Sequence, residues 1–150
     1  MTSALVTDFY ELTMMQGYFL EHHNPRVVFD MFYRTNPFNG GYTIFTGLEE
    51  LVTKLEEFRF SKEDIEYLRS LGKFQESFLD YLSSYRFTGD LYAFDEGTPA
   101  FPQEPLIRIE TNMLDAQLIE SILLNTINFQ TLIATKASRM KLATKGKGSI

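Results

Sequence analysis

The spacing of apolar residues predicts four helices in the first part of the chain. Apolar side chains recur every three or four positions there, as they do when one face of a helix is buried. The predicted helices cover residues 7–21, 48–58, 61–71 and 74–85. Thr7 is the expected N-cap of the first helix, and Ser61 with Asp64 is expected to form a capping box at the third.

Other stretches are typical of strands, because β-branched and aromatic residues dominate them or because apolar and polar residues alternate. Two of these stretches, residues 26–34 and 42–46, flank the sequence TNPFNGG, whose Pro, Asn and Gly residues predict a turn. After Arg86 the apolar residues recur at every second position instead of every third or fourth. Three short β segments are expected there: residues 87–97, 98–102 and 106–111.

The last predicted element is one long helix from about Met113 to Thr144, which carries apolar residues on several sides. A helix of that kind is expected to be buried, and to expose apolar area and associate where its partner elements are missing. The strands lie close together in the chain, which favours an α+β fold with an antiparallel or mixed sheet. We expect an α+β domain over residues 1–112, followed by the long helix and a basic tail over 113–150.

Charged residues are distributed unevenly along the chain. Residues 1–135 hold nine cations and 20 anions, a net charge of −11, whereas five cations and no anion follow. Those cations either favour the dipole at a helix C-terminus or face a phosphate group. They are too few to predict nucleic-acid binding.

The chain contains no cysteine, which excludes disulfides and Cys-ligated metal sites. Its first residues have no basic segment and carry Asp8 and Glu11 within an apolar stretch, so no signal peptide is expected. No uncharged apolar run is long enough to predict a membrane span. A cytoplasmic location is therefore expected.

Candidate chemistry is sparse when only the residues are considered. His22 and His23 are adjacent at a helix end, where they point in different directions and make a poor metal pair, so no metal site is expected. Residues 38–42, FNGGY, could cradle a phosphate but favour a structural turn. Tyr10 could present its ring to a flat ligand with Asp8 accepting a hydrogen bond, although their spacing alone favours a cap and a packed ring.

Three acidic residues near turns, Asp90, Asp95 and Glu96, could in principle divide acid and base roles. Nothing in their spacing shows that they converge, and carboxylates in turns are usually solvated. The residues alone therefore indicate an α+β domain and no particular reaction.

Four segments, in order, resemble the beginning of a nicotinate phosphoribosyltransferase. They are TDFYELTMMQGYF (7–19), FDMFYRTNPFNGGYTIFTGLEEL (29–51), YRFTGDLYAFDEGTPAFPQEPLIRIE (85–110) and AQLIESILLNTINFQTLIATKASRM (116–140). The resemblance implies the N-terminal α/β-sandwich-like domain of a type II phosphoribosyltransferase. The long buried helix would lead into an α/β barrel that is absent from this chain.

The family's reaction joins nicotinate to phosphoribosyl pyrophosphate and releases nicotinate mononucleotide and pyrophosphate, the entry step of nicotinate salvage into NAD. The resemblance implies coupled ATP hydrolysis through a phosphorylated histidine, accompanying Mg²⁺, and a homodimer whose active site takes residues from both subunits. The catalytic groups are expected after Ile150. We therefore expect no catalytic residue within this chain and no activity from it alone.

The resemblance also implies roles for particular residues. Tyr10 matches an aromatic residue that stacks on the pyridine ring of nicotinate from the neighbouring subunit, with Asp8 as a second binding candidate. Lys136 and Arg139 lead toward the phosphate-binding segment. Two alternatives remain open: a non-catalytic interaction module that reuses the fold, and a sister enzyme acting on nicotinamide or quinolinate.

Overall fold

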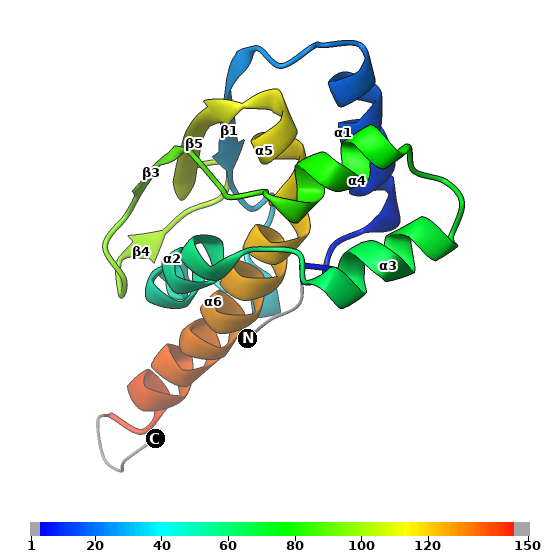
Figure 1. The fold of residues 1–150 in the computed structure, drawn as a ribbon. Helices are drawn as coiled ribbons and strands as arrows, with labels where there is room; N and C mark the ends of the chain where they lie inside the picture. Colours follow the sequence, from blue (N-terminus) through cyan, green and yellow to red (C-terminus); the bar gives the residue numbers. More distant parts are fainter. Residues whose placement is uncertain (1–3, 146–150) are drawn as a thin grey trace.

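The computed structural model describes residues 4–145 (Figure 1). The last residues of the predicted basic tail, 146–150, lie outside this range. The elements are, in order, α1 (Phe9–Leu20), β1 (Arg26–Met31), the short 3₁₀ turn η1 (Pro37–Asn39), β2 (Thr43–Ile44), α2 (Leu48–Glu57), α3 (Lys62–Ser70), α4 (Glu76–Ser83), β3 (Asp90–Ala93), β4 (Pro99–Ala100), β5 (Ile107–Asn112), α5 (Met113–Leu118) and α6 (Glu120–Ala143). The prediction of an α+β fold is confirmed.

The strands form two antiparallel sheets. One has three strands in the order β1-β5-β3, and the other pairs β2 with β4. Strand β1 ends at Met31, three residues before the predicted end. Its register partner there is Ile107, the first residue of β5, and beyond it Tyr33 accepts the backbone N–H of Gln103 from the loop before β5 at 2.9 Å.

The three-stranded sheet has one buried face and one exposed face. Along β5 the side chains of Ile107, Ile109 and Thr111 are buried, and helix α5 packs against this side of the sheet. The other face carries ion pairs: Arg108 of β5 lies 3.0 Å from Asp30 of β1, and Arg26 of β1 reaches Asp90 of β3 at 2.9 Å. Exposed pairs of this kind contribute little to stability, so the buried face holds the sheet in place.

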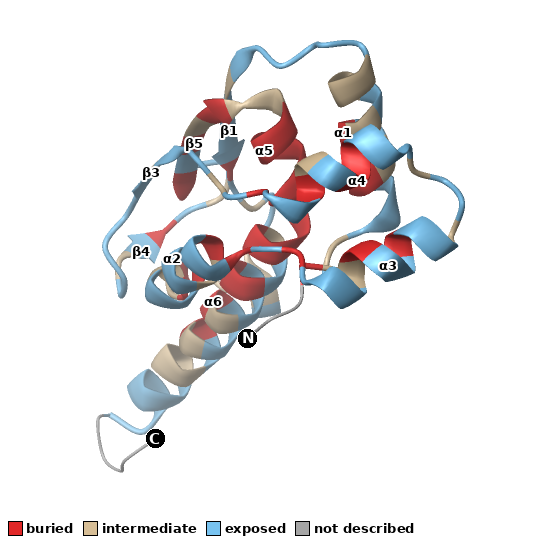
Figure 2. Ribbon diagram, viewed as in Figure 1, coloured by how far each residue is buried: buried red, intermediate tan, exposed pale blue. Residues whose placement is uncertain are grey.

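A cluster of aromatic rings joins α1 to α4. The ring of Phe78 is fully buried, and its centroid lies 5.6 Å from Phe19, 5.9 Å from Phe74 and 6.4 Å from Tyr81. The predicted capping box at Ser61 and Asp64 is confirmed and begins α3 nearby. Figure 2 shows the buried positions gathering where α1, α4, α5 and the first half of α6 meet.

The predicted single C-terminal helix is wrong, because the structure has two helices with a break at Ile119. The backbone N–H of Ser121 donates to the Glu11 carboxylate at 3.0 Å, where a continuous helix would direct it to the carbonyl of Gln117. An acceptor on α1 therefore accounts for the loss of the helical bond at this point.

The expectation that this helix is buried holds for one face only. Ile127 and Thr135 are buried, whereas Phe129 and Leu142 are each 68% exposed. In Figure 1 the last turns of α6 project beyond the sheets. The expected exposed apolar area is thus confirmed, and self-association through it stays a prediction.

Candidate functional site

The candidate site lies where the first turn of α1 meets the first turn of α6. Asp8 is the N-cap of α1, with extended backbone angles (φ −72°, ψ 139°), and its carbonyl accepts the N–H of Glu11. The prediction that Thr7 is the N-cap is wrong. Its hydroxyl instead donates to the side chain of Glu11, so it is not available to cap the backbone.

Glu11 is a buried acid that the sequence patterns do not single out. Its side chain is fully buried, and one carboxylate oxygen accepts both the N–H (3.0 Å) and the hydroxyl (2.8 Å) of Ser121. Burial raises the pKa of Glu11, while the hydrogen bonds from Thr7 and Ser121 act in the opposite direction. This carboxylate also places negative charge at the N-terminus of α6, where the helix dipole favours it.

Tyr10, the next residue along α1, points outward. Its side chain is 45% exposed, and its hydroxyl donates to the carboxylate of Glu120 at 2.9 Å. The bond to Glu120 raises the pKa of the Tyr10 hydroxyl to about 12, because losing the proton would put two anions side by side. The ring is held at one edge and is accessible on the surface, so the packed position favoured by spacing alone is not what the structure has.

Asp8 is exposed close to Tyr10, and its backbone N–H donates to the hydroxyl of Ser121 at 3.2 Å. Its side chain makes no capping bond to the helix backbone. The structure thus brings together both predicted substrate-binding residues, Tyr10 and Asp8.

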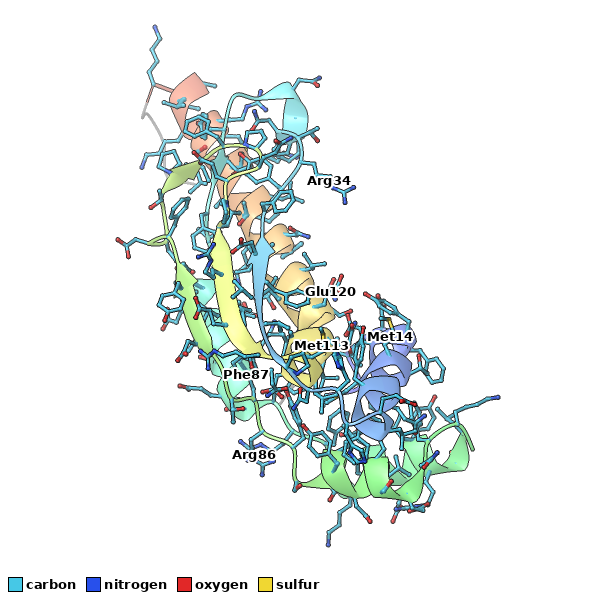
Figure 3. All side chains as sticks on the ribbon, turned by 90° about the horizontal axis from the view of Figure 1, so that it is seen from above. Met14, Arg34, Arg86, Phe87, Met113 and Glu120 are labelled. Carbon is cyan, nitrogen blue, oxygen red and sulfur yellow. The ribbon has the colours of Figure 1, made fainter. Side chains whose placement is uncertain are left out.

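A cleft of about 270 Å³ opens beside this junction, between β1, β5 and the α5–α6 break. Its floor is apolar and includes Ile109 and Ile119, and Glu120 and Arg34 are among its polar lining residues. In Figure 3 Arg34 and Glu120 lie on the same side of the molecule, with Arg34 pointing away from the ribbon. Glu120 therefore belongs both to the bond that holds Tyr10 and to the wall of the cleft.

Lys136 and Arg139 lie far from Tyr10 and contact the η1 turn. Arg139 donates to the carbonyl of Phe38 at 2.8 Å, and the ammonium of Lys136 lies 5.9 Å from the centre of the Phe38 ring. Nineteen residues separate Arg139 from Glu120 on α6, which corresponds to about 28 Å along the helix axis. The structure therefore does not place these cations in one site with Tyr10.

The FNGGY segment forms a turn that these cations brace. Phe38 and Asn39 both have positive φ, of 58° and 51°. A side chain at Gly40 would meet the guanidinium of Arg139 at 3.3 Å and the carbonyl of Pro37 at 3.2 Å. The close packing of Arg139 over the glycine accounts for the glycine here and favours the structural turn over the phosphate cradle.

The remaining polar candidates do not form a site within residues 4–145. His22 and His23 are exposed at the end of α1, and no cluster of metal-binding side chains occurs in this range. Asp90 pairs with Arg26, and Glu96 accepts the backbone N–H of Gly47 at 2.6 Å at the start of α2. None of the helices described between residues 4 and 145 is long and apolar enough to cross a membrane.

Comparison with known proteins shows the family to which the chain belongs. Residues 5–128 match the family model described as the nicotinate phosphoribosyltransferase (NAPRTase) N-terminal domain, so the match includes α1, Tyr10 and the first turns of α6. The chain belongs to the nicotinate phosphoribosyltransferase family.

Two bacterial relatives show how far the similarity extends. A nicotinate phosphoribosyltransferase of Mycobacterium tuberculosis is 43% identical over 144 residues, 96% of this chain. The enzyme of the same name from Bacillus subtilis is 43% identical over 139 residues, 92% of this chain. The chain spans 31% and 28% of the lengths of these two relatives.

Solved structures agree with the fold of this family. The crystal structure of human nicotinic acid phosphoribosyltransferase has a TM-score of 0.84 and 31% identity over 91% of this chain and 28% of its own. Nicotinate-nucleotide pyrophosphorylase from Pyrococcus furiosus has a TM-score of 0.73 and 25% identity over 95% of this chain and 29% of its own. The fold of more than nine-tenths of this chain is therefore similar to that of solved structures.

Proposed function

We propose that the chain forms the N-terminal domain of a cytoplasmic enzyme that joins nicotinate to phosphoribosyl pyrophosphate, with ATP, in NAD salvage. The products are nicotinate mononucleotide and pyrophosphate. The observation that carries the proposal is the family match over residues 5–128, which spans nearly the whole chain. The relatives that match over more than nine-tenths of this chain are named for this activity.

The proposed chemistry divides between this domain and other parts of the enzyme. Displacement at the ribose carbon needs a flat pocket for the aromatic acid and positive charge on the leaving pyrophosphate. Tyr10 offers the flat surface. Residues 4–145 hold no group of acidic or histidine side chains placed to hold a metal ion, and the roles proposed for these residues concern nicotinate.

We further propose that the exposed ring of Tyr10 stacks on nicotinate within a homodimer, with Asp8 beside it as a weaker candidate. The ring is 45% exposed and bonded only at its hydroxyl edge to Glu120, which leaves its faces accessible to a ligand or to a second subunit. Aromatic rings favour offset stacking over a direct face-to-face arrangement, and an exposed ring can offer that geometry to a flat ligand.

The proposed activity is tested by measuring pyrophosphate release from phosphoribosyl pyrophosphate with nicotinate, nicotinamide or quinolinate as acceptor. We expect release by the protein as its cell makes it, with nicotinate as the preferred acceptor, and no release by residues 1–150 alone. No nicotinate-dependent release by the cell's protein would contradict the proposal and favour the non-catalytic interaction module. Release by residues 1–150 would contradict the assignment of the catalytic groups to other parts of the enzyme.

Replacing Tyr10 with alanine is expected to raise the KM for nicotinate about fivefold or more, because a stacked ring contributes about 1 kcal/mol. The matched variant Tyr10→Phe keeps the ring and loses only the bond to Glu120, so a smaller rise is expected. Steady-state kinetics with each substrate varied in turn measures both effects. If neither variant changes the KM for nicotinate, Tyr10 has a structural role only.

A further inference from the structure

Two adjacent residues of α1 bond two adjacent residues of α6. Tyr10 donates to Glu120 at 2.9 Å, while Glu11 accepts from the N–H and the hydroxyl of Ser121 at 3.0 and 2.8 Å. The Ser121 hydroxyl also accepts the backbone N–H of Asp8 at 3.2 Å. These bonds, which we call the α1–α6 latch, join the first turns of the two helices in a single register.

The latch has a buried layer and an exposed layer. Glu11 and Ser121 are buried, whereas Tyr10 and Glu120 are exposed. A hydrogen bond to a charged group is stronger than a neutral one, and its electrostatic part strengthens away from water. The exposed bond between Tyr10 and Glu120 competes with water and is weaker. The buried bonds between Glu11 and Ser121 therefore fix the position of the Tyr10 backbone.

We propose that Glu11 is a positioning residue that holds Tyr10 in the orientation needed to stack on the pyridine acid. This inference rests on the proposed function and adds a residue to it. Glu11 itself has no exposed surface and cannot touch the ligand, so it acts through the helix register. Stacking depends on the distance and plane of the ring, and errors of about 1 Å in a binding group reduce rates strongly.

The central test compares two changes at Glu11 in the protein as its cell makes it. Glu11→Ala removes the acceptor, and the KM for nicotinate is expected to rise about fivefold, as far as it does for Tyr10→Ala. Glu11→Gln keeps an oxygen that accepts from Ser121, so the KM is expected to stay within about twofold of the wild type. The KM for phosphoribosyl pyrophosphate is expected to be unchanged in both.

A double variant separates positioning from simple loss of stability. If Glu11 acts only through Tyr10, the change in the KM for nicotinate in Glu11→Ala combined with Tyr10→Ala is no larger than in Tyr10→Ala alone. Independent roles would multiply the two effects. Leu12→Ala is the control for stability: this neighbour on α1 is 2% exposed and apolar, so its loss should lower the melting temperature and leave the KM for nicotinate unchanged.

A second measurement covers the case in which Glu11→Ala does not fold. Ser121→Ala removes the hydroxyl that bonds Glu11 and Asp8 but keeps the backbone N–H of α6. The titration of Tyr10 is followed by NMR of ¹³C-labelled tyrosine, assigned with Tyr10→Phe. The pKa of about 12 is expected to fall toward 10 in Ser121→Ala as the bond to Glu120 is lost.

The outcomes distinguish the inference from the proposed function. An active wild type with an unchanged KM in Glu11→Ala, an equal rise in Leu12→Ala, or an unchanged titration of Tyr10 in Ser121→Ala would overturn the inference alone. A wild type without nicotinate-dependent pyrophosphate release would overturn the proposed function and, with it, the stacking role that Glu11 is said to support.

Discussion

Phe78→Ala is expected to lower the free energy of unfolding by about 3–5 kcal/mol, which is a large part of the total for a domain of this size. The ring is fully buried and lies against Phe19, Phe74 and Tyr81, so its removal leaves a cavity among groups that cannot all move in to fill it. The melting temperature should fall by about 10 °C. Urea denaturation of residues 1–150 and of the variant measures the difference.

Phe129→Ala is the matched control for this prediction. The same ring is removed there, but the side chain is 68% exposed near the middle of α6. Its effect on the free energy of unfolding is expected to lie within about 0.5 kcal/mol. If Phe129→Ala is as damaging as Phe78→Ala, then this part of α6 is covered in solution, and the exposed face described above is an interface.

Asp115→Ala is expected to destabilise the protein by about 3 kcal/mol, because the N–H and the hydroxyl of Thr88 each lose a charged acceptor. Asp115 is 1% exposed and accepts the N–H of Thr88 at 3.1 Å and the hydroxyls of Thr88 and Thr111 at 3.0 and 3.3 Å. Beside it lies Tyr85, whose pKa is raised first by burial and then by this carboxylate. The carboxylate thus ties the loop before β3 to β5 and α5.

Asp115→Asn separates the acceptor from the charge. The amide oxygen still accepts from Thr88, so the loss is expected to be about 1 kcal/mol. Denaturation midpoints of the two variants, measured at the same pH, give the difference. Equal losses would show that charge decides the contribution of Asp115, and no loss in either would show that the loop before β3 does not depend on it.

Features that depend on neighbours in the chain could be predicted from the sequence. The capping box joins Ser61 to Asp64 across one turn, and β3 pairs with β5 within the single stretch of residues 90–112. The alternation of buried and exposed residues in Ile107–Asn112 likewise shows which face of β5 meets the helices. Local chemistry determines each of these, so the pattern was sufficient.

Features that depend on distant residues could not be predicted in this way. The break at Ile119 requires Glu11, which is separated from Ser121 by 110 positions in the chain. Within the candidate site, spacing alone favoured a packed Tyr10, and only its resemblance to a family motif indicated an exposed ring. The contact of Arg139 with Phe38 spans 101 positions, and no local pattern shows that these cations brace a turn.

Because the helix is broken at Ile119, a change of angle at that residue would move the whole of α6. Its 24 residues extend about 36 Å, from the latch at one end to the last turns at the other. A tilt of about 5° at the break would displace the far end of such a helix by about 3 Å, which exceeds the tolerance of a packed interface. The carboxylate of Glu11 lies beside this break, where it accepts from Ser121. The latch thus fixes one end of α6, while the hydroxyls of Thr131 and Thr135, which accept backbone N–H groups of Thr46 and Ile44, hold the helix farther along.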